Sequence, residues 1–508
     1  MAAVSVFGYL CYLVLVGLIG ISVKYLYSIR FAWRIPLAPS AKRYTAHTRY
    51  FFGQDTQRAL HTMIRFCTTP LRIARLQIGP TPVILLLHPD VIQKVLSSNE
   101  MYSKPFIYDL MQIGRGLISE RDGAYWKKTR KAVNPSFSPK ILAGFVPRFD
   151  SRAQALVNRL RPVADGTTVI NILDYAAQCT LEMVFSTTLG SKLEELPGER
   201  EYTEYLERIQ NILGKRLLNY ENFLDLIYKF TDAYRQEMSY RKIVNGFVDN
   251  IIEARRQKLR DSNNNNNNTD SEDDLDSCFT ANIFLDEIFN IRFNGKPLDD
   301  KEVSDHMYTM IAAGNETSAQ AFCYVCLMLA QNPDVQDKVV TELREVLPPR
   351  GEPLTPEDLK NLEYTERVIK ETLRLFPVAP LVSRQTTSPI ELDGFHIPPG
   401  QILAMNFYTL HRRPDVWGPD PERFDPDRFL VDAVRERHPY AYLPFSGGFR
   451  ICIGHKYAMN ALKAMLARVL TEFEVRTDIR QSDMKFRFEL SMKLVGPHAV
   501  TLSRRSLL

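Results

Sequence analysis

The stretch FSGGFRICIG, residues 445–454, constrains the fold more than any other part of the chain. It places Cys452 directly before apolar residues spaced three and four apart over 458–469, and this spacing predicts a helix that starts near Gly454. The unpaired N–H groups and the dipole at a helix N-terminus stabilise an anion, and Arg450 adds a fixed cation. The sequence therefore predicts a cysteine whose thiolate is stabilised.

Three interpretations of Cys452 remain open on these residues alone. It could be a structural cysteine in a turn, a nucleophile or a metal ligand. A nucleophile needs a partnered base, and His455 is the candidate by proximity in sequence. The rest of the chain has to decide between them.

The first 23 residues carry no charged side chain, and residues 4–23 are long enough to cross a bilayer as a helix. A cleaved secretory signal would carry positive charge before its apolar run, whereas here the charges follow it, at Lys24, Arg30 and Arg34. The positive-inside rule then leaves the N-terminus lumenal and everything after Lys24 cytosolic.

This pattern divides the chain into three parts. We expect a transmembrane signal-anchor over 1–24, a basic connector with Pro36 and Pro39 over 25–40, and a globular domain over 41–508. The net charge of +5 on 508 residues is too small to suggest a nucleic-acid partner.

Seven cysteines, an odd number without a regular framework, indicate reduced thiols that face the cytosol. Cys323 and Cys326 form a CxxC, but they lie in the apolar run AFCYVCLMLA. We therefore expect them to be packed in the core and not to bind zinc or undergo redox chemistry.

Periodicity predicts a mainly α-helical fold with small β-sheets. Residues 120–375 are mostly helical in pattern, whereas 378–430 is short, Pro-rich and strand-like, with IELDGF and HIPPGQIL arranged as a hairpin. Residues 261–276, DSNNNNNNTDSEDDLD, hold almost no apolar side chain and predict a flexible, exposed, Asn-rich acidic loop.

A second candidate site lies in AAGNETS, residues 312–318. Glu316 is the only acid or base between Met307 and Ala330, and an acid buried in such a helix is costly unless it is paired or functional. We expect Gly314 to leave room beside the helix, and the Thr317 hydroxyl to bond back to an earlier carbonyl and hold a local distortion. Space for a diatomic ligand would result.

Two further motifs are weak when taken alone. Glu371 and Arg374, in KETLR, lie at i and i+3 on one helical face, and Trp126 and Arg130, in WKKTR, lie at i and i+4. Such pairs are common on solvated surfaces, where they contribute little. Whether either pair indicates a functional site depends on the motifs around it.

The motif F-x-x-G-x-R-x-C-x-G resembles the haem-binding loop of the cytochrome P450 family; it is matched by Phe445, Gly448, Arg450, Cys452 and Gly454. The resemblance extends over nearly the whole chain, because the anchor, connector, WxxxR, AAGNETS, ExxR and F-x-P-x-R-F segments follow in the family's order. It implies the cytochrome P450 fold with an N-terminal transmembrane helix, and haem as cofactor.

By this resemblance Cys452 is the axial thiolate of the haem iron. The other residues that it assigns to the cofactor are Trp126, Arg130, Ala313, Arg384, Phe445 and Arg450, of which Trp126 and the three arginines hold the propionates. In the family branch known for fatty-acid ω-hydroxylation (clan 4), a glutamate often occupies the position of Ala313 and bonds covalently to haem. Alanine here predicts non-covalent haem b.

The resemblance also implies that Thr317 hydrogen-bonds dioxygen and that Glu316 helps to deliver protons. Glu371 and Arg374 would form a buried network with an arginine from a later F-x-P-x-R-F segment. The sequence contains two candidates for this arginine, Arg423 in PERF and Arg428 in FDPDRF. The fuller match favours Arg428.

The function implied is a membrane-bound haem-thiolate monooxygenase of the endoplasmic reticulum, single-pass with a cytosolic catalytic domain. Its electrons would come from an NADPH-dependent flavoprotein reductase, with cytochrome b5 as an optional donor. We expect a lipophilic substrate from the apolar segments that would line its pocket: 106–118, Tyr308, Ala312, 378–381 and 493–495. An acidic electron donor would meet a basic patch of Lys127, Lys128, Lys131 and Lys456.

Two alternatives differ in class. One is a haem-thiolate isomerase or dehydratase of oxygenated lipids, which needs no reductase. The other is a haem gas sensor or carrier that does not turn over. Retention of Glu316 and Thr317 argues against the first, because that chemistry needs no proton delivery to dioxygen.

Overall fold

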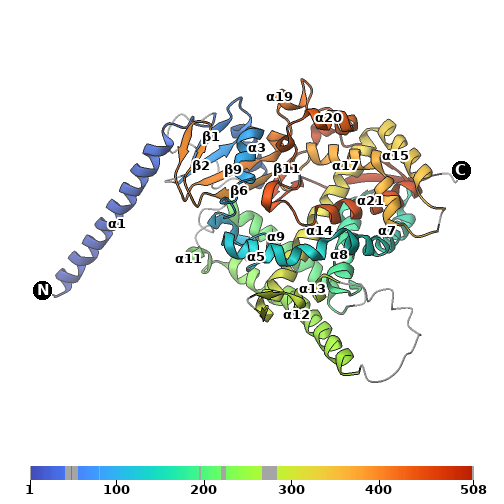
Figure 1. The fold of residues 1–508 in the computed structure, drawn as a ribbon, viewed down its shortest axis with the longest axis horizontal. Coiled ribbons are helices and arrows are strands. Elements are labelled where there is room, and N and C mark those ends of the chain that lie inside the picture. The colour runs from blue at the N-terminus through green and yellow to red at the C-terminus, as the bar shows by residue number, and fades with distance from the viewer. Residues whose placement is uncertain are drawn as a thin grey trace.

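A computed structural model describes residues 2–39, 47, 55–78, 81–111, 113–193, 196–218, 225–265, 283–293, 295–349 and 351–505. The described chain is mainly helical with small sheets, so the predicted fold class is confirmed (Figure 1). Its principal helices are α1 (Ala2–Ala32), α3 (Thr56–Cys67), α4 (Pro89–Leu96), α5 (Gly123–Val133), α7 (Val146–Leu160), α8 (Ile172–Val184), α9 (Glu199–Leu218), α12 (Asp232–Asn265), α14 (Asp300–Gln331), α15 (Pro333–Val346), α17 (Glu363–Leu375) and α21 (His455–Glu472).

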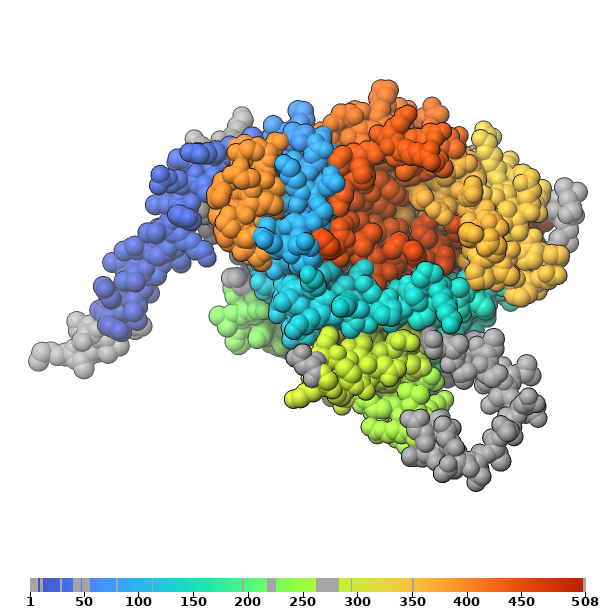
Figure 2. Space-filling model, in the orientation of Figure 1, coloured from blue at the N-terminus to red at the C-terminus, as the bar shows by residue number. Residues whose placement is uncertain are grey.

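Helix α1 projects from the body, which only its C-terminal end touches (Figures 1 and 2). Within it, Tyr12–Ala32 is long and apolar enough to cross a membrane. The helix continues past residue 24, the predicted end of the anchor, because the basic stretch that follows contains no glycine or proline before Pro36. The expected connector thus begins as helix, and contact with the body starts at buried Ala32 and Ile35.

Helix α14 runs through the middle of the body (Figure 1). Asp299 starts it with a capping box, in which its carboxylate accepts from the Glu302 N–H while Glu302 reaches back to the Asp299 N–H. The C-terminal half, residues 318–329, is buried on all sides within the largest core cluster. Such a helix has no solvent face, and it fixes the helices packed around it, which include α8, α15, α17 and α21.

The described residues form five small sheets, of which two have more than two strands. The four-stranded sheet has the order β1-β2-β9-β6, with β2 and β9 parallel and the other pairs antiparallel. The three-stranded sheet has the order β10-β13-β3. The strands concerned are β1 (Ile73–Ile78), β2 (Thr81–Leu86), β3 (Asp165–Asn171), β6 (Leu381–Gln385), β9 (Ile402–Asn406), β10 (Phe473–Arg476) and β13 (Ala499–Arg504).

A hairpin forms in the predicted segment, as β7 (Ile390–Leu392) paired with β8 (Phe395–Ile397), but its arms are shorter than predicted, since Ile402 and Leu403 belong to β9 of the four-stranded sheet. Asp393 and Gly394 make its turn with φ of 50° and 79°. Positive φ at both positions suits the right-handed twist of the strands and explains why Asp-Gly stands there. A second hairpin, β11 (Phe486–Glu489) with β12 (Ser491–Leu494), turns at Leu490, which has φ of 66°.

The predicted loop over 261–276 is wrong at its start. Helix α12 continues through Asn265, carried by the strongly helix-forming residues that precede the asparagines. Residues 266–276 of the predicted loop lie outside the described residues. Cys323 and Cys326 are fully buried free thiols, which confirms their packing role.

Candidate active site

The cysteine loop is shaped by close backbone contacts. Gly448 has φ of 65°, and a side chain there would place its Cβ 1.8 Å from the Leu96 carbonyl oxygen. The Cys452 N–H donates to the Phe445 carbonyl at 2.9 Å, and α21 begins directly afterwards with Gly454 at its N-cap. The predicted helix start is confirmed, and only glycine fits at position 448.

His455 is turned to the backbone and not to the thiol. Its Nδ1 lies 3.0 Å from the Cys452 carbonyl oxygen. The base that a cysteine nucleophile would need is therefore engaged elsewhere.

The Cys452 side chain is exposed, whereas Cys67, Cys179, Cys323 and Cys326 are buried. Burial raises the pKa of the Cys452 thiol, against the opposing effects of a Gly454 backbone hydrogen bond and the Arg130 charge, so the predicted stabilisation of the thiolate by the loop alone is wrong. The exposed Cys452 side chain leaves open space in front of the sulfur.

The middle of α14 also retains accessible surface. Ala312, Ala313, Glu316 and Thr317 are partly exposed, although the residues that flank them in the helix are largely buried. The Thr317 hydroxyl donates to the Ala313 carbonyl at 2.7 Å, as expected for a back-bonded threonine.

The structure contradicts two expectations for this helix, a local distortion and free space beside Gly314. Helix α14 is continuous from Asp300 to Gln331. A Cβ at Gly314 would lie 2.8 Å from Val184 Cγ2 on α8. The glycine is used for close packing of two helices, which leaves no free space on that side.

Glu316 has partners on the β11–β12 hairpin. Its Oε1 accepts from the Ser491 hydroxyl at 2.7 Å and lies 2.9 Å from Lys493 Nζ. The acid that seemed costly in an apolar helix is therefore paired.

A cluster of buried cations lies near the cysteine loop. Arg450 is stacked over the Trp126 ring, 4.4 Å from its centroid, and its Nη2 donates to the Glu120 carbonyl at 2.8 Å. Arg384 and Lys104 are buried as well, and donate only to backbone carbonyls, of Ser383 and Ile118. Among the described residues, none of the three cations forms an ion pair with a carboxylate.

The pKa values of these cations are lowered by burial and by their mutual repulsion. Burial, followed by repulsion from Arg384, lowers the pKa of Arg450 to about 9. Burial lowers the pKa of Lys104 well below its usual value, with further repulsion from Arg450 and Arg384. Burial also lowers the pKa of partly buried Arg130, which the nearby Cys452 opposes. Since Arg450 Nε and Nη1 are buried without a hydrogen-bond partner, the cluster has the charge and the free donors to hold an anion.

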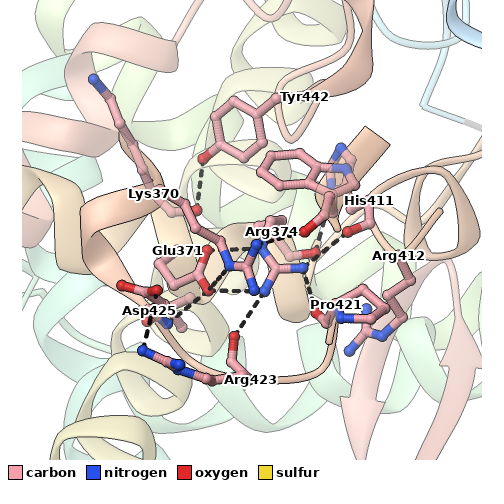
Figure 3. Close-up of polar contacts among 12 residues, drawn as sticks. Lys370, Glu371, Arg374, His411, Arg412, Pro421, Arg423, Asp425 and Tyr442 are labelled. Carbon is pink, nitrogen blue, oxygen red and sulfur yellow. Dashed lines mark hydrogen bonds and ion pairs between the residues drawn. The ribbon is translucent and has the colours of Figure 1, made fainter. Parts of the chain in front are cut away.

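Glu371 and Arg374 form a fully buried bidentate pair, with Nε to Oε2 at 2.7 Å and Nη2 to Oε1 at 2.8 Å (Figure 3). The remaining N–H groups of Arg374 donate to three carbonyls, so that all five donors are used. Burial raises the pKa of Glu371, and the Arg374 guanidinium opposes that rise. The three carbonyls are those of His411, Pro421 and Arg423.

Of the two candidate arginines, Arg428 approaches this pair with its side chain. Its Nε lies 3.7 Å from Glu371 Oε1, and its terminal nitrogens donate to the carbonyls of Trp417 and Asp420. Arg423 contributes only its carbonyl, while its guanidinium is largely exposed and pairs with Asp425.

His411 links the pair to the segment that leads into the cysteine loop. Its Nδ1 lies 3.2 Å from the Arg374 carbonyl oxygen, and its Nε2 accepts from the Leu443 N–H at 2.8 Å. Tyr442, next to Leu443, donates to the Lys370 carbonyl at 2.8 Å (Figure 3). The network therefore holds the chain just before residue 445.

Sequence reasoning missed Lys104, His411 and Ser491, and it placed Lys493 only in the pocket-lining segment 493–495, not beside Glu316. Each comes from a segment without a motif and reaches the site only through the tertiary fold. A buried lysine or histidine looks like any surface residue in a sequence, so no local signal could have identified them.

The comparisons with known proteins agree with one another. The cytochrome P450 family model matches residues 48–501. Among curated relatives, Cytochrome P450 4c21 of Blattella germanica is 31% identical over 432 residues, covering 84% of this chain and 85% of the relative. Cytochrome P450 4V2 of Rattus norvegicus is 31% identical over 439 residues, covering 86% and 83%. The solved cytochrome P450DA heme domain superposes with a TM-score of 0.76 at 22% identity, covering 93% of this chain and 98% of that one, which shows the shared fold.

Fold and site thus define a haem-thiolate protein of the monooxygenase class. The chain belongs to the cytochrome P450 family, and its similarity is to the family-4 members. The family implies haem iron with a cysteine thiolate ligand. The residues fit that cofactor, because the Cys452 thiol is exposed, and the buried cations, of which Arg450 has two unused donors, suit two propionate carboxylates.

Replacing Arg450 by methionine is expected to weaken haem retention without weakening the haem-free protein. Loss of a charge-assisted hydrogen bond costs about 1.5–3 kcal/mol, so haem should transfer to apomyoglobin about tenfold faster or more. The haem-free variant should be at least as stable as the parent, because one uncompensated buried cation is gone. Lys128→Met, at an exposed lysine of α5, is the control; equal haem retention in both variants would contradict the assignment.

Proposed function

We propose that this chain is a membrane-anchored monooxygenase that inserts one oxygen atom of dioxygen into a lipophilic substrate. The observation that carries the proposal is the accessible yet desolvated thiol of Cys452, in a loop that only glycine permits at position 448. When bound, haem supplies the chemistry of dioxygen activation and C–H oxidation. The protein would supply the thiolate ligand, the binding site and the protons.

The cofactor would be held at its iron and at its acidic edge. Cys452 provides the thiolate, while Trp126, Arg130, Arg384 and Arg450 surround the carboxylates, with Phe445 beside the thiolate loop. Lys104 joins them, as its position beside Arg384 and Arg450 supports. Ala313 has no carboxylate to offer, so haem b binds without a covalent bond from this position.

On the distal side, Thr317 and Glu316 handle protons. The Thr317 hydroxyl donates to the Ala313 carbonyl, so its oxygen keeps lone pairs that can accept, and its O–H can serve the substrate dioxygen after rotating away from that carbonyl. Glu316 is the nearest acid in α14, and its carboxylate is the group that can renew the Thr317 proton. Glu371, Arg374 and Arg428 hold the chain that precedes the thiolate loop and take no part in the chemistry.

The substrate pocket has one feature that the sequence did not suggest. A cavity of about 850 Å³ opens between α12 and α14, and Tyr308 lines it with its hydroxyl bonded to Asp249 at 2.7 Å. Most of its other lining residues are charged or polar, among them Arg241, Asp300 and Asp305. A lipophilic substrate therefore has to be recognised deeper, beside Ala312 and Val378, while Tyr308 belongs to a polar vestibule.

Electrons would come from a membrane-bound NADPH-dependent reductase, with cytochrome b5 as a second donor. Lys127, Lys128, Lys131 and Lys456 are all exposed and form the basic surface for an acidic partner. The apolar helix α1 supports anchoring in the endoplasmic reticulum membrane, with the catalytic domain in the cytosol. Two N-glycosylation sequons, Asn267-Asn268-Thr269 and Asn315-Glu316-Thr317, should remain unmodified if the domain is cytosolic. The second is no test of this topology, because Asn315 is buried and bonded to Thr180, and the first lies outside the described residues.

The test is the absorption spectrum of the purified, dithionite-reduced protein under carbon monoxide. A strongly red-shifted Soret band, of the kind that a thiolate ligand produces, is expected. A band at the shorter wavelength of histidine-type ligation would contradict the proposal. Substrate-dependent NADPH consumption with a reductase then separates a monooxygenase from a reductase-independent isomerase and from a gas sensor.

A further inference from the structure

The partners of Glu316 form a second functional unit at the tip of the β11–β12 hairpin. Lys493 Nζ lies 2.9 Å from Glu316 Oε1 and 3.5 Å from Glu489 Oε2, and Arg487 Nε lies 3.1 Å from Glu489 Oε1. Ser491 donates to Glu316 at 2.7 Å. Two carboxylates and two cations thus balance one another in a largely buried place, with Glu489, Ser491 and Lys493 all buried.

The hairpin is held from two sides. The Tyr324 hydroxyl, on α14, donates to the Met492 carbonyl at 2.6 Å, and the Met492 N–H donates to the Val378 carbonyl at 2.8 Å. On the other side, α9 lies so close that a Cβ at Gly214 would come within 2.7 Å of Glu489 Cγ. The tip is therefore wedged between α9 and α14.

This arrangement fixes the direction of the Glu316 carboxylate. Glu316 and Thr317 are adjacent in a helix, so their side chains leave the axis about 100° apart. The Thr317 hydroxyl donates to the Ala313 carbonyl, while Glu316 is held on the hairpin by Ser491 and Lys493. With several rotatable bonds, a released Glu316 side chain would be free to turn toward the accessible side of the helix.

We propose that Lys493 and Ser491 are positioning residues that hold Glu316 against the β11–β12 hairpin and so restrain its proton supply to Thr317. The inference rests on the proposed function, because it assigns a restraint to the acid of that site. Displacement of the hairpin, which α9 touches at Gly214, would release the carboxylate. The hairpin thereby couples the position of α9 to the protonation machinery of α14.

The experiment measures NADPH oxidation by the full chain with a P450 reductase in the absence of added substrate. In this leak reaction NADPH, one proton and dioxygen give NADP⁺ and hydrogen peroxide. Lys493→Met should raise the rate at least about threefold, since a fully engaged general acid contributes roughly a hundredfold or more. Lys493→Arg, which keeps the charge, should restore the parent rate.

Two controls assign the effect to Glu316. In a Glu316→Gln background, Lys493→Met should have no further effect, because no carboxylate remains to be released. Lys485→Met, at an exposed lysine of the same hairpin region, should leave the rate unchanged. An unchanged rate in Lys493→Met, or the same increase with and without Glu316, would overturn the proposal.

Hydrogen exchange of the hairpin separates failure of this inference from failure of the proposed function. Residues 486–494 should exchange faster in Lys493→Met and in Glu316→Gln, with no addition in the double variant. A preparation without the red-shifted carbon monoxide band defeats the proposed function, but this exchange pattern would still support the ion pair as the restraint. Unchanged exchange would overturn the restraint in any preparation.

Discussion

Replacing Arg374 by methionine should lower the free energy of unfolding by about 3–5 kcal/mol, the cost of stranding a buried charge. The Glu371 carboxylate would lose its bidentate partner while fully buried, and three backbone carbonyls would lose their donor. Urea denaturation followed by circular dichroism measures the change. The same preparation should also lose haem, because the network holds the segment before the thiolate loop through His411 and Leu443.

Arg423→Met is the matched control for this experiment. Arg423 lies on the same segment, but its guanidinium is 68% exposed, and it serves the network only through its carbonyl, which methionine retains. A loss within about 0.5 kcal/mol is expected, as is usual at the surface. If Arg423→Met proved as damaging as Arg374→Met, the literal PERF motif would be the third member of the network, and Arg428 would not.

Replacing Cys452 by serine should abolish the red-shifted carbon monoxide band and leave the fold intact. Serine is smaller than cysteine and keeps the backbone hydrogen bond from residue 452 to the Phe445 carbonyl. The sulfur faces open space, so no packing contact of consequence is lost. Serine is a far weaker donor to iron than a thiolate, and thiolate donation is the basis of the spectrum.

The measurement compares the carbon monoxide spectrum and the unfolding curve of the same sample. A red-shifted band that persists in Cys452→Ser would mean that another residue supplies the ligand. Loss of the band together with a large loss of stability would show that Cys452 is structural, which is one of the interpretations that the sequence alone left open.

Local patterns predicted the elements well where one chemistry dominates. The hairpin around residues 390–397 and the helix that starts near Gly454 depend on nearby residues alone, and the sequence predicted both elements. Gly314 shows the limit of such reasoning. In sequence a glycine in a helix suggests free space, but the structure uses it to bring Val184 of α8 close, and only the packing partner decides between the two.

The residues of the site also differ in how well the sequence alone predicts them. The motifs gave the residues that carry the chemistry, because a cysteine, an acid and an alcohol in an apolar setting are visible one at a time. The groups that hold them are contributed by distant segments, as Lys493 and Ser491 are for Glu316. A buried charge requires such partners. The sequence indicates that partners are needed, but it does not identify the residues that provide them.

His411 makes the stability of the segment before the thiolate loop sensitive to acid. Its ring serves as a neutral connector between the Arg374 carbonyl and the Leu443 N–H, and burial lowers its pKa to about 3. In the unfolded chain the ring is protonated below about pH 6.5, whereas in the folded protein it stays neutral. Below that pH the unfolded state therefore binds one more proton than the folded state. Folding stability then falls by about 1.4 kcal/mol per pH unit until roughly pH 3. Acidification therefore weakens the fold through the residue that joins the buried network to the segment before the cysteine loop.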